Sequence, residues 1–216
     1  MLGNIAEVLE EVSWPSPIDG VVIRGWHYEA GVSAERVIEV APYPEQEGSG
    51  ERGSRRWVEW SLGRRAVADA LEQLGVGPGV VVVDDRGAPQ LADRSVGISI
   101  SHTSRLVLAA AGHGAVGIDV ERADRDVTRL ERALLPGETD ISTSLGLLET
   151  LVVKEAAAKL TGDGLGGSLA RWPVLDVELF GQQPAVAVGT PSGGVISARV
   201  WERQGYVVAL AFSPNA

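Results

Sequence analysis

Most apolar runs in this chain are short enough to be single β-strands, and only three stretches carry the spacing of an amphipathic helix. Alternating apolar residues favour strands, whereas apolar residues three and four positions apart favour helices. Strands are predicted at 21–26, 37–40, 80–83, 96–100, 106–110, 116–121, 174–179, 185–188, 195–201 and 206–211. Helices are predicted at 60–74, which Gly75 and Gly77 end, and at 126–135 and 143–160.

The order of these elements is roughly repeated on either side of a glycine break at residues 112–114. No repeat of individual residues is visible, so the repetition concerns element order alone. We therefore expect an α+β fold of two similar lobes, residues 1–113 and 114–216, related by pseudo-twofold symmetry. Such an arrangement places a ligand cleft between the lobes. The Pro-rich and Gly-rich segment 42–53 is predicted to be a mobile loop.

The composition limits the chemistry that the chain can perform. With 216 residues, of which 44% are hydrophobic, it can bury a sizeable core without covalent crosslinks. It contains no cysteine, which excludes disulfides, zinc-thiolate sites and thiol catalysis. Any metal must therefore have oxygen or imidazole ligands, a preference that favours magnesium.

Charge and hydropathy exclude further classes. A net charge of -10 argues against binding to duplex nucleic acid, although a few arginines can still form a local phosphate site. Glu7, Glu10 and Glu11 give the first residues the wrong charge for a targeting signal. No apolar run approaches the roughly 20 residues of a membrane span. We expect a cytoplasmic protein that binds neither nucleic acid nor membranes.

The segment 116–121, VGIDVE, carries the first candidate site. The alternation of a strand sends Asp119 and Glu121 to one face, where a cation can bridge two carboxylates. Taken alone, the segment is better explained as a strand edge whose polar face is open to water.

The segment 148–159, LETLVVKEAAAK, carries the second candidate site. Helical spacing places Glu155 and Lys159 in one stripe with Leu148 and Val152. A surface ion pair would explain the two charges. However, the opposite stripe is also largely apolar, so most of this helix should be buried, and a buried carboxylate needs a metal or cation as its partner.

The segment 97–104, GISISHTS, carries the third candidate site. Its strand ends at Ser101 and His102, and an imidazole there can donate to phosphate oxygens, although a lone histidine is more often structural. Upstream, residues 86–89 (RGAP) predict a turn, and Arg64 lies on the helix 60–74.

Together, SISHT, GIDVE and KEAAAK resemble in order and spacing the motifs of the 4'-phosphopantetheinyl transferase superfamily. The chain is similar in length to members of the surfactin-type branch, which are two-lobed monomers, and Glu121 supports this likeness. The resemblance extends from about residue 55 to residue 159. This chain departs from the family at Leu151 and Val152, where an aromatic and a hydroxyl residue are usual. It also has Ala88 where a lysine is common, which leaves Arg86 as the nearest substitute.

The resemblance implies a magnesium-dependent enzyme that transfers 4'-phosphopantetheine from coenzyme A to a serine of an apo acyl or peptidyl carrier protein, releasing 3',5'-ADP. It implies a coenzyme A side in the first lobe and a metal and catalytic side in the second. The implied metal ligands are Asp119, Glu121 and Glu155. Glu155, or a water that it orients, would accept the serine proton, and Lys159 would donate to the departing phosphate. The implied coenzyme-binding residues are Arg56, Arg64, Arg86, Ser101, His102 and Lys159, with Arg55 a further candidate.

An acidic carrier requires a local basic surface on this acidic protein. Arg125, Arg129 and Arg132 would share one face of the predicted helix 126–135, although a solvated face balanced by Glu131 explains them equally well. The carrier could serve fatty-acid, polyketide or nonribosomal peptide synthesis. Two other functions remain open: a degenerate relative that binds coenzyme A or a carrier without transfer, and an unrelated magnesium-dependent phosphohydrolase.

Overall fold

The computed structural model describes residues 9–42, 50–133, 138, 144–178 and 183–213. The fold is α+β, as the sequence predicts. Its helices are α1 (Ala34–Val40), α2 (Arg55–Gln73) and α4 (Leu147–Thr161), with the 3-10 turns η1 (Thr128–Ala133) and η2 (Leu169–Arg171). In the described part of the chain, no helix is long and apolar enough to cross a membrane.

The strands form two antiparallel sheets and a short hairpin. The first sheet has the order β1 (Leu9–Trp14), β2 (Val21–Tyr28), β6 (Leu106–Gly112), β5 (Gly97–Thr103). The second has the order β7 (Val116–Arg122), β11 (Tyr206–Phe212), β10 (Val195–Arg203), β9 (Ala185–Gly189), β8 (Val174–Glu178). The hairpin pairs β3 (Val81–Val83) with β4 (Pro89–Leu91).

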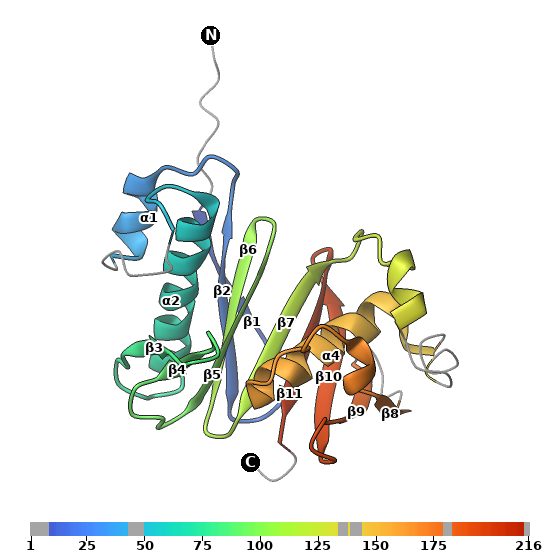
Figure 1. Ribbon diagram of the computed structural model, residues 1–216. Helices are drawn as coiled ribbons and strands as arrows, with labels where there is room; N and C mark the ends of the chain where they lie inside the picture. Colours follow the sequence, from blue (N-terminus) through green and yellow to red (C-terminus); the bar gives the residue numbers. More distant parts are fainter. Residues whose placement is uncertain (1–8, 43–49, 134–137, 139–143, 179–182, 214–216) are drawn as a thin grey trace.

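Three apolar clusters order these elements into four layers. One cluster lies between α2 and the first sheet, and another between α4 and the second sheet. The third lies between the two sheets and includes Ile23, Leu108, Ile118 and Leu210. The layers are therefore helix, sheet, sheet, helix, and Figure 1 shows α2 and α4 on the outer sides of the two sheets. The burial of apolar side chains in these three clusters is the dominant contribution to the stability of the fold.

Strands β5 and β7 are the edge strands at which the two sheets meet. Each ends the strand order of its own sheet, and the two strands lie in contact. Serine hydroxyls replace a regular ladder between them: Ile118 N donates to Ser99 Oγ at 3.0 Å, and Val120 N donates to Ser101 Oγ at 3.3 Å. Two otherwise unpaired edge N–H groups are thereby satisfied.

Most predicted elements are present, with shifted ends. The helix predicted at 60–74 begins five residues earlier, because Ser54 caps it by accepting from Trp57 N. The helix predicted at 143–160 begins as α4 at Leu147 after Gly146 and ends at Thr161, where the following Gly162 caps it in the left-handed conformation with φ +72°. Residues 43–49 of the predicted loop, and the predicted element ends at 135, 143 and 179, lie outside the described residues.

Two predictions about elements are wrong, and two strands are missed. Residues 37–40 form part of α1 rather than a strand, because Ser33 caps a helix there and Val37 packs into the α2 cluster. The described part of the predicted helix 126–135, residues 126–133, is not α-helical: the side chain of Asp126 accepts from Thr128 N and the chain then turns into η1. Strands β1 and β4 are not predicted. The pseudo-twofold relation and the boundary at residue 113 stay predictions.

Candidate active site

Helix α4 crosses strand β7 at Gly117, which brings together the two segments with candidate catalytic residues. A Cβ atom on Gly117 would lie 2.1 Å from Ala156 O and 2.7 Å from Leu160 N. Only glycine allows this approach of helix to strand. Because alternate residues of a strand share a face, Asp119 lies on the same side as Gly117, toward the C-terminal turns of α4.

Asp119 contacts Lys159 and Ser101 in a compact polar cluster. Lys159 Nζ lies 2.6 Å from Asp119 Oδ1 and donates to Ser101 Oγ at 2.8 Å. Ser101 Oγ donates to the same Asp119 oxygen at 2.8 Å. Asp119 is only 3% exposed. The structure therefore brings together three predicted site residues from β5, β7 and α4.

The second oxygen of Asp119 is buried and has no hydrogen-bond partner among the described residues. An unsatisfied buried carboxylate oxygen is costly, and it marks a position where a cation or ligand can be accommodated. Carboxylate oxygens are the donors that magnesium prefers. By its chemistry, Asp119 therefore fits one of the metal ligands implied by the sequence.

The charges of both other candidate ligands, Asp119 and Glu121, affect the pKa of Glu155. Burial, the largest cause, and the negative charges of Asp119 and Glu121 together raise the pKa of Glu155 to about 7, against the lowering effect of Lys159 and Arg125. This pKa places a proton acceptor near neutral pH. A bound divalent cation would favour the ionised carboxylate and lower the pKa.

Glu121, the third candidate ligand, lies two residues after Asp119 on strand β7. It accepts a hydrogen bond from Thr103 Oγ1 at 3.4 Å and forms an ion pair with Arg125. No group of three or more His, Cys, Asp or Glu side chains with metal-binding geometry occurs within the described ranges. In this structure the cations Lys159 and Arg125 are the charged partners of Asp119 and Glu121.

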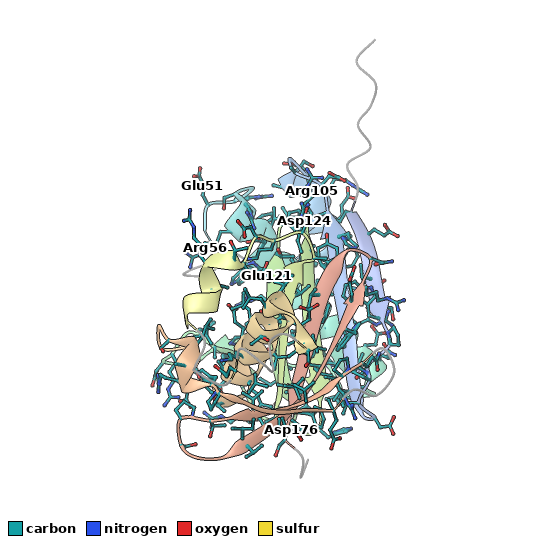
Figure 2. All side chains as sticks on the ribbon, turned by 90° about the vertical axis from the view of Figure 1, so that its right-hand side faces the viewer. Glu51, Arg56, Arg105, Glu121, Asp124 and Asp176 are labelled. Atoms are coloured by element: carbon teal, nitrogen blue, oxygen red, sulfur yellow. The ribbon has the colours of Figure 1, made fainter. Side chains whose placement is uncertain are left out.

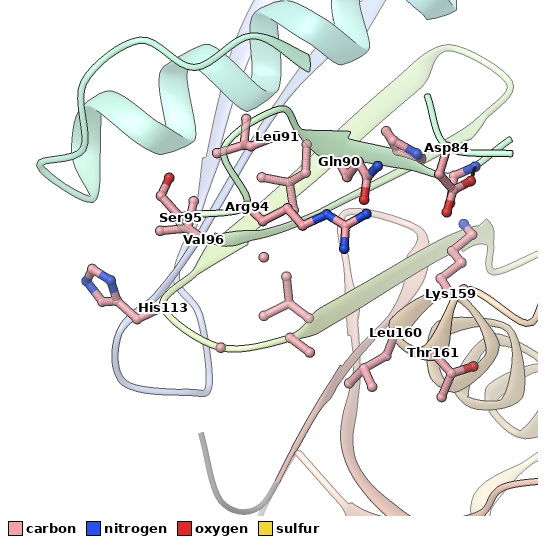
Figure 3. Close-up of a pocket in the computed structure, with 18 residues that line it drawn as sticks. Asp84, Gln90, Leu91, Arg94, Ser95, Val96, His113, Lys159, Leu160 and Thr161 are labelled. Atoms are coloured by element: carbon pink, nitrogen blue, oxygen red, sulfur yellow. Dashed lines mark hydrogen bonds between the residues drawn. The ribbon is translucent and has the colours of Figure 1, made fainter. Parts of the chain in front are cut away.

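A cavity of about 390 Å³, which we call the junction cavity, borders this cluster and is lined by both halves of the chain. Its walls include Asp84, Gln90, Arg94, His113, Lys159 and Thr161. Figure 3 shows the side chains of Arg94 and Lys159 extending into it. Two cationic groups thus line this cavity, and one of them, Lys159, also contacts Asp119.

A second cavity of about 430 Å³, the α2 cavity, collects three of the predicted coenzyme-binding residues. Arg56, Arg64 and His102 line it together with Glu59, Trp60 and Pro89. The guanidinium of Arg64 lies over the Trp60 ring, 3.7 Å from its centroid. His102 Nδ1 lies 3.4 Å from the buried carboxylate of Glu59. This cavity combines apolar and basic groups, a combination suited to a phosphorylated ligand.

Arg86 and Ala88 belong to the turn between β3 and β4. Arg86 does not line the α2 cavity; it is exposed and pairs with Asp163, beyond the end of α4, at 2.7 Å. Ala88 lines the junction cavity. Arg55, the further candidate, contacts Glu59 at 2.7 Å and is largely exposed. Of the predicted arginines, the structure therefore groups Arg56 and Arg64 with His102.

The three arginines predicted for carrier binding do not share an α-helical face. Arg125 lies in the connection after β7, and Arg129 lies in η1 and is exposed. The side chain of Arg132 lies outside the described part of the structure. Figure 2 shows Arg56, Arg105, Glu121 and Asp124 toward one end of the molecule and Asp176 toward the other. The end nearest Glu121 thus carries several charged side chains of both signs.

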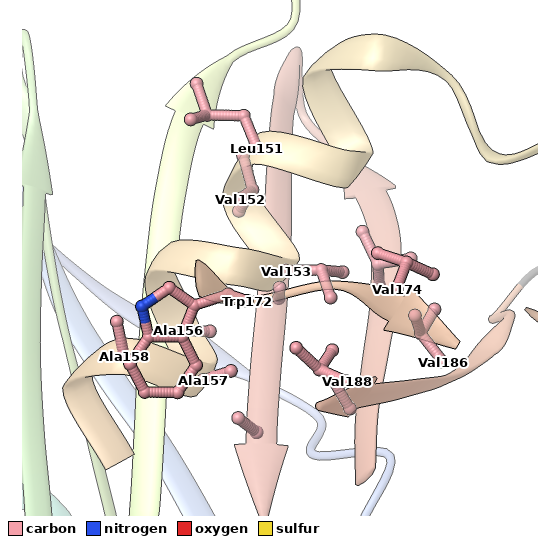
Figure 4. Close-up of a cluster of buried hydrophobic side chains, with 14 of the residues drawn as sticks. Leu151, Val152, Val153, Ala156, Ala157, Ala158, Trp172, Val174, Val186 and Val188 are labelled. Atoms are coloured by element: carbon pink, nitrogen blue, oxygen red, sulfur yellow. The ribbon is translucent and has the colours of Figure 1, made fainter. Parts of the chain in front are cut away.

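Leu151 and Val152, the positions at which the chain departs from the family motif, are core residues of the cluster beneath α4. Figure 4 shows this cluster around Trp172, Val174 and Val188. Lys154, one turn further along α4, is fully buried and pairs with Glu138 at 2.6 Å. It also donates to Leu169 O at 3.2 Å. The departures thus lie in the packing of α4 rather than in its polar cluster.

Several residues around the cluster were not predicted from the sequence. Ser99 and Thr103 lie on the same face of β5 as Ser101 and contact β7, while Glu59 and Glu138 are buried acids with cationic partners. The alternation of hydroxyl residues in GISISHT could have predicted that Ser99 and Thr103 share a face with Ser101. Nothing near Glu138 pointed to this acid, because its partner Lys154 lies in another segment, whereas Glu59 pairs with Arg55 one turn away on α2.

Comparison with known proteins adds one match. Residues 51–112 match the family model described as the 4'-phosphopantetheinyl transferase N-terminal domain, a stretch that contains α2 and β3 to β6. The comparison with curated proteins gave no match. The matched residues therefore support placing the chain in the 4'-phosphopantetheinyl transferase superfamily, and they suggest phosphopantetheinyl transfer in general as its activity.

Proposed function

We propose that this protein transfers the 4'-phosphopantetheine group of coenzyme A to a serine of an apo acyl or peptidyl carrier protein. The observation that carries the proposal is the contact of Lys159 with Asp119, next to Glu155, at the junction of the two halves. The family match covers the half that supplies Ser101 and His102. The proposed branch is the surfactin type, in which one chain contains the whole site.

The proposed metal is magnesium, with Asp119, Glu121 and Glu155 as its protein ligands. The ion would supply charge neutralisation for the pyrophosphate of coenzyme A during phosphoryl transfer. The unsatisfied Asp119 Oδ2 supports this assignment, and so does the raised pKa of Glu155, which is caused first by burial and then by the nearby charges of Asp119 and Glu121.

In the proposed reaction, the carrier serine oxygen attacks the pyrophosphate phosphorus that bears the pantetheine group. A new P–O bond forms to serine, and the bond from that phosphorus to the bridging oxygen breaks, so 3',5'-ADP leaves. Glu155 accepts the serine proton directly or through a water. Lys159 donates to the departing phosphate oxygen and offsets its growing negative charge.

The two cavities give the coenzyme two places to bind. Arg56, Arg64 and His102 in the α2 cavity suit its phosphate groups and the adjoining apolar surface. Lys159 belongs both to the junction cavity and to the Asp119 cluster, so it can contact the pyrophosphate. Arg86 is engaged with Asp163, and its coenzyme role therefore requires that this pair open.

The proposed partner is an acidic carrier that approaches the end of the site near Glu121. Arg125 and Arg129 lie in the segment that follows β7 and can offer positive charge there. Arg125 already pairs with Glu121, so carrier binding and the charge of the site are expected to be coupled.

The test is product analysis with a panel of apo-carriers, coenzyme A and magnesium. Transfer adds the mass of one phosphopantetheine group to a carrier and releases one equivalent of 3',5'-ADP. Release of 3',5'-ADP without modified carrier would indicate a phosphohydrolase. Binding of coenzyme A with neither product would indicate a non-catalytic relative and overturn the proposal.

A further inference from the structure

The hydroxyl group of Ser101 has already made every hydrogen bond that it can make. It donates to Asp119 Oδ1 at 2.8 Å and accepts from Lys159 Nζ at 2.8 Å and from Val120 N at 3.3 Å. A serine hydroxyl offers one donor and two acceptor lone pairs, so this set exhausts its capacity. No bonding position remains for a phosphate oxygen.

The position of Ser101 in strand β5 leads to the same conclusion. Ser101 is 3% exposed, whereas the side chain of the next residue, His102, is 52% exposed. Because neighbouring strand residues point to opposite faces, His102 faces Glu59 on α2 and the α2 cavity, while Ser101 faces β7. The two residues of the Ser-His element therefore serve different surroundings.

We propose that Ser101 is a positioning residue for Asp119 and Lys159 rather than a coenzyme-binding residue. Its single hydroxyl holds one carboxylate oxygen and one ammonium group and is itself fixed by the backbone of β7. Asp119 Oδ1 is thereby occupied, and Oδ2 is left as the unpartnered buried oxygen for a cation. Outer partners that fix a ligating carboxylate typically change metal affinity or activity about 10- to 100-fold when removed. This inference rests on the proposed function only for its activity readout.

Ser99 provides a matched control on the same strand and face. Its hydroxyl accepts from Ile118 N at 3.0 Å, the same kind of bond to β7 that Ser101 accepts from Val120 N. Ser99 is 5% exposed. Removing either hydroxyl leaves one buried β7 N–H without its partner, but only Ser101 contacts Asp119 and Lys159. A difference between the two alanine variants therefore reports on positioning.

The experiment compares wild type, Ser101→Ala and Ser99→Ala by three measurements. The first is manganese binding, followed by the electron paramagnetic resonance of free Mn²⁺ without coenzyme or carrier. The second is coenzyme A affinity by calorimetry without divalent metal. The third is the separation of kcat from KM for coenzyme A in the transfer assay.

We expect Ser101→Ala to bind manganese about 10-fold or more weakly and to lose kcat, with coenzyme A affinity unchanged. Ser99→Ala should lose comparable thermal stability but keep manganese affinity and kcat. Equal manganese affinity in the two variants would overturn the inference, as would a selective loss of coenzyme A affinity in Ser101→Ala. If Ser101→Ala does not fold, Ser101→Thr, which keeps the hydroxyl, must bind manganese as wild type does, and a loss there also overturns it. A wild type that transfers nothing refutes the proposed function, but the manganese comparison still decides the role of Ser101.

Discussion

Lys159 on α4 reaches Asp119 on β7 and places its ammonium nitrogen 2.6 Å from Oδ1 of that carboxylate. The contact joins residues 40 positions apart in the sequence, and the lysine side chain remains 32% exposed. A buried carboxylate is thus paired with a cation that still reaches the junction cavity. The same ammonium group can therefore serve Asp119 in the free protein and a phosphate in the complex.

Replacing Lys159 by methionine tests this dual role. The variant keeps the length of the side chain but loses the cation, so turnover should fall about 100-fold or more through lost stabilisation of the leaving phosphate. Lys159 lowers the pKa of Glu155, and its loss should move the acidic limb of the pH-rate profile to higher pH. Magnesium-dependent binding of coenzyme A, measured by calorimetry, should persist. Unchanged turnover and an unchanged profile would remove Lys159 from the site.

Replacing Glu155 by glutamine should change how stability depends on pH. In metal-free wild type, the folded pKa of about 7 exceeds the ordinary value of 4.5. The folded protein therefore holds this proton more tightly than the unfolded chain, and the resulting stability is lost as pH rises from about 4.5 to 7. Glutamine removes that loss, so the variant should gain up to about 3 kcal/mol relative to wild type at pH 8 and little near pH 5.

Denaturant unfolding of both proteins at the two pH values measures this difference. A free-energy difference that does not change with pH would contradict the shifted pKa of Glu155. The same substitution should abolish most turnover, since the proposed proton acceptor is lost.

Replacing Gly117 by alanine should separate α4 from β7. The added Cβ would lie 2.1 Å from Ala156 O, so the helix must shift, at a cost of about 1–3 kcal/mol. Turnover should also fall, because Glu155 and Lys159 move with the helix. Gly77→Ala is the control, since no atom lies within 4 Å of its new Cβ. Thermal unfolding and turnover check the pair, and equal behaviour would show that the close approach at Gly117 is unimportant.

Breaking the buried pair of Lys154 and Glu138 should destabilise the protein. Glu138→Gln leaves an ammonium group without its charged partner in the core, a loss of about 3–5 kcal/mol. The double variant Glu138→Gln, Lys154→Met removes both charges and should recover much of that loss. Chemical denaturation of the two variants measures the recovery. A double variant no more stable than Glu138→Gln would show that the buried charge is not the cause.

The sequence predicted those parts of the site that depend on short-range periodicity. The alternation in VGIDVE predicted that Asp119 and Glu121 share one face of a strand, and the spacing in LETLVVKEAAAK predicted that Glu155 and Lys159 share one stripe of a helix. The contact of Lys159 with Asp119 is known only from the structure. Apolar alternation likewise predicted most strands of both sheets.

Features that depend on tertiary partners were missed. Nothing local distinguishes Ser101, whose hydroxyl is occupied by β7 and α4, from a serine that faces a ligand. Arg86 lies near the expected turn but is drawn to Asp163, which is 77 residues away. The residues 37–40 read as a strand because their β-branched side chains favour one, yet the Ser33 cap and the packing of Val37 against the α2 cluster outweigh that preference.

Intact-mass measurement of one apo-carrier, incubated with coenzyme A and magnesium and with either wild type or Asp119→Asn, tests the central claim most directly. Asparagine keeps the shape of the buried side chain but removes its charge, so folding should be preserved while the site loses the carboxylate at its centre. The account predicts that wild type adds one phosphopantetheine group to the carrier serine and that Asp119→Asn leaves the carrier unmodified on the same timescale. A carrier modified at the same rate by both proteins in saturating magnesium would contradict it.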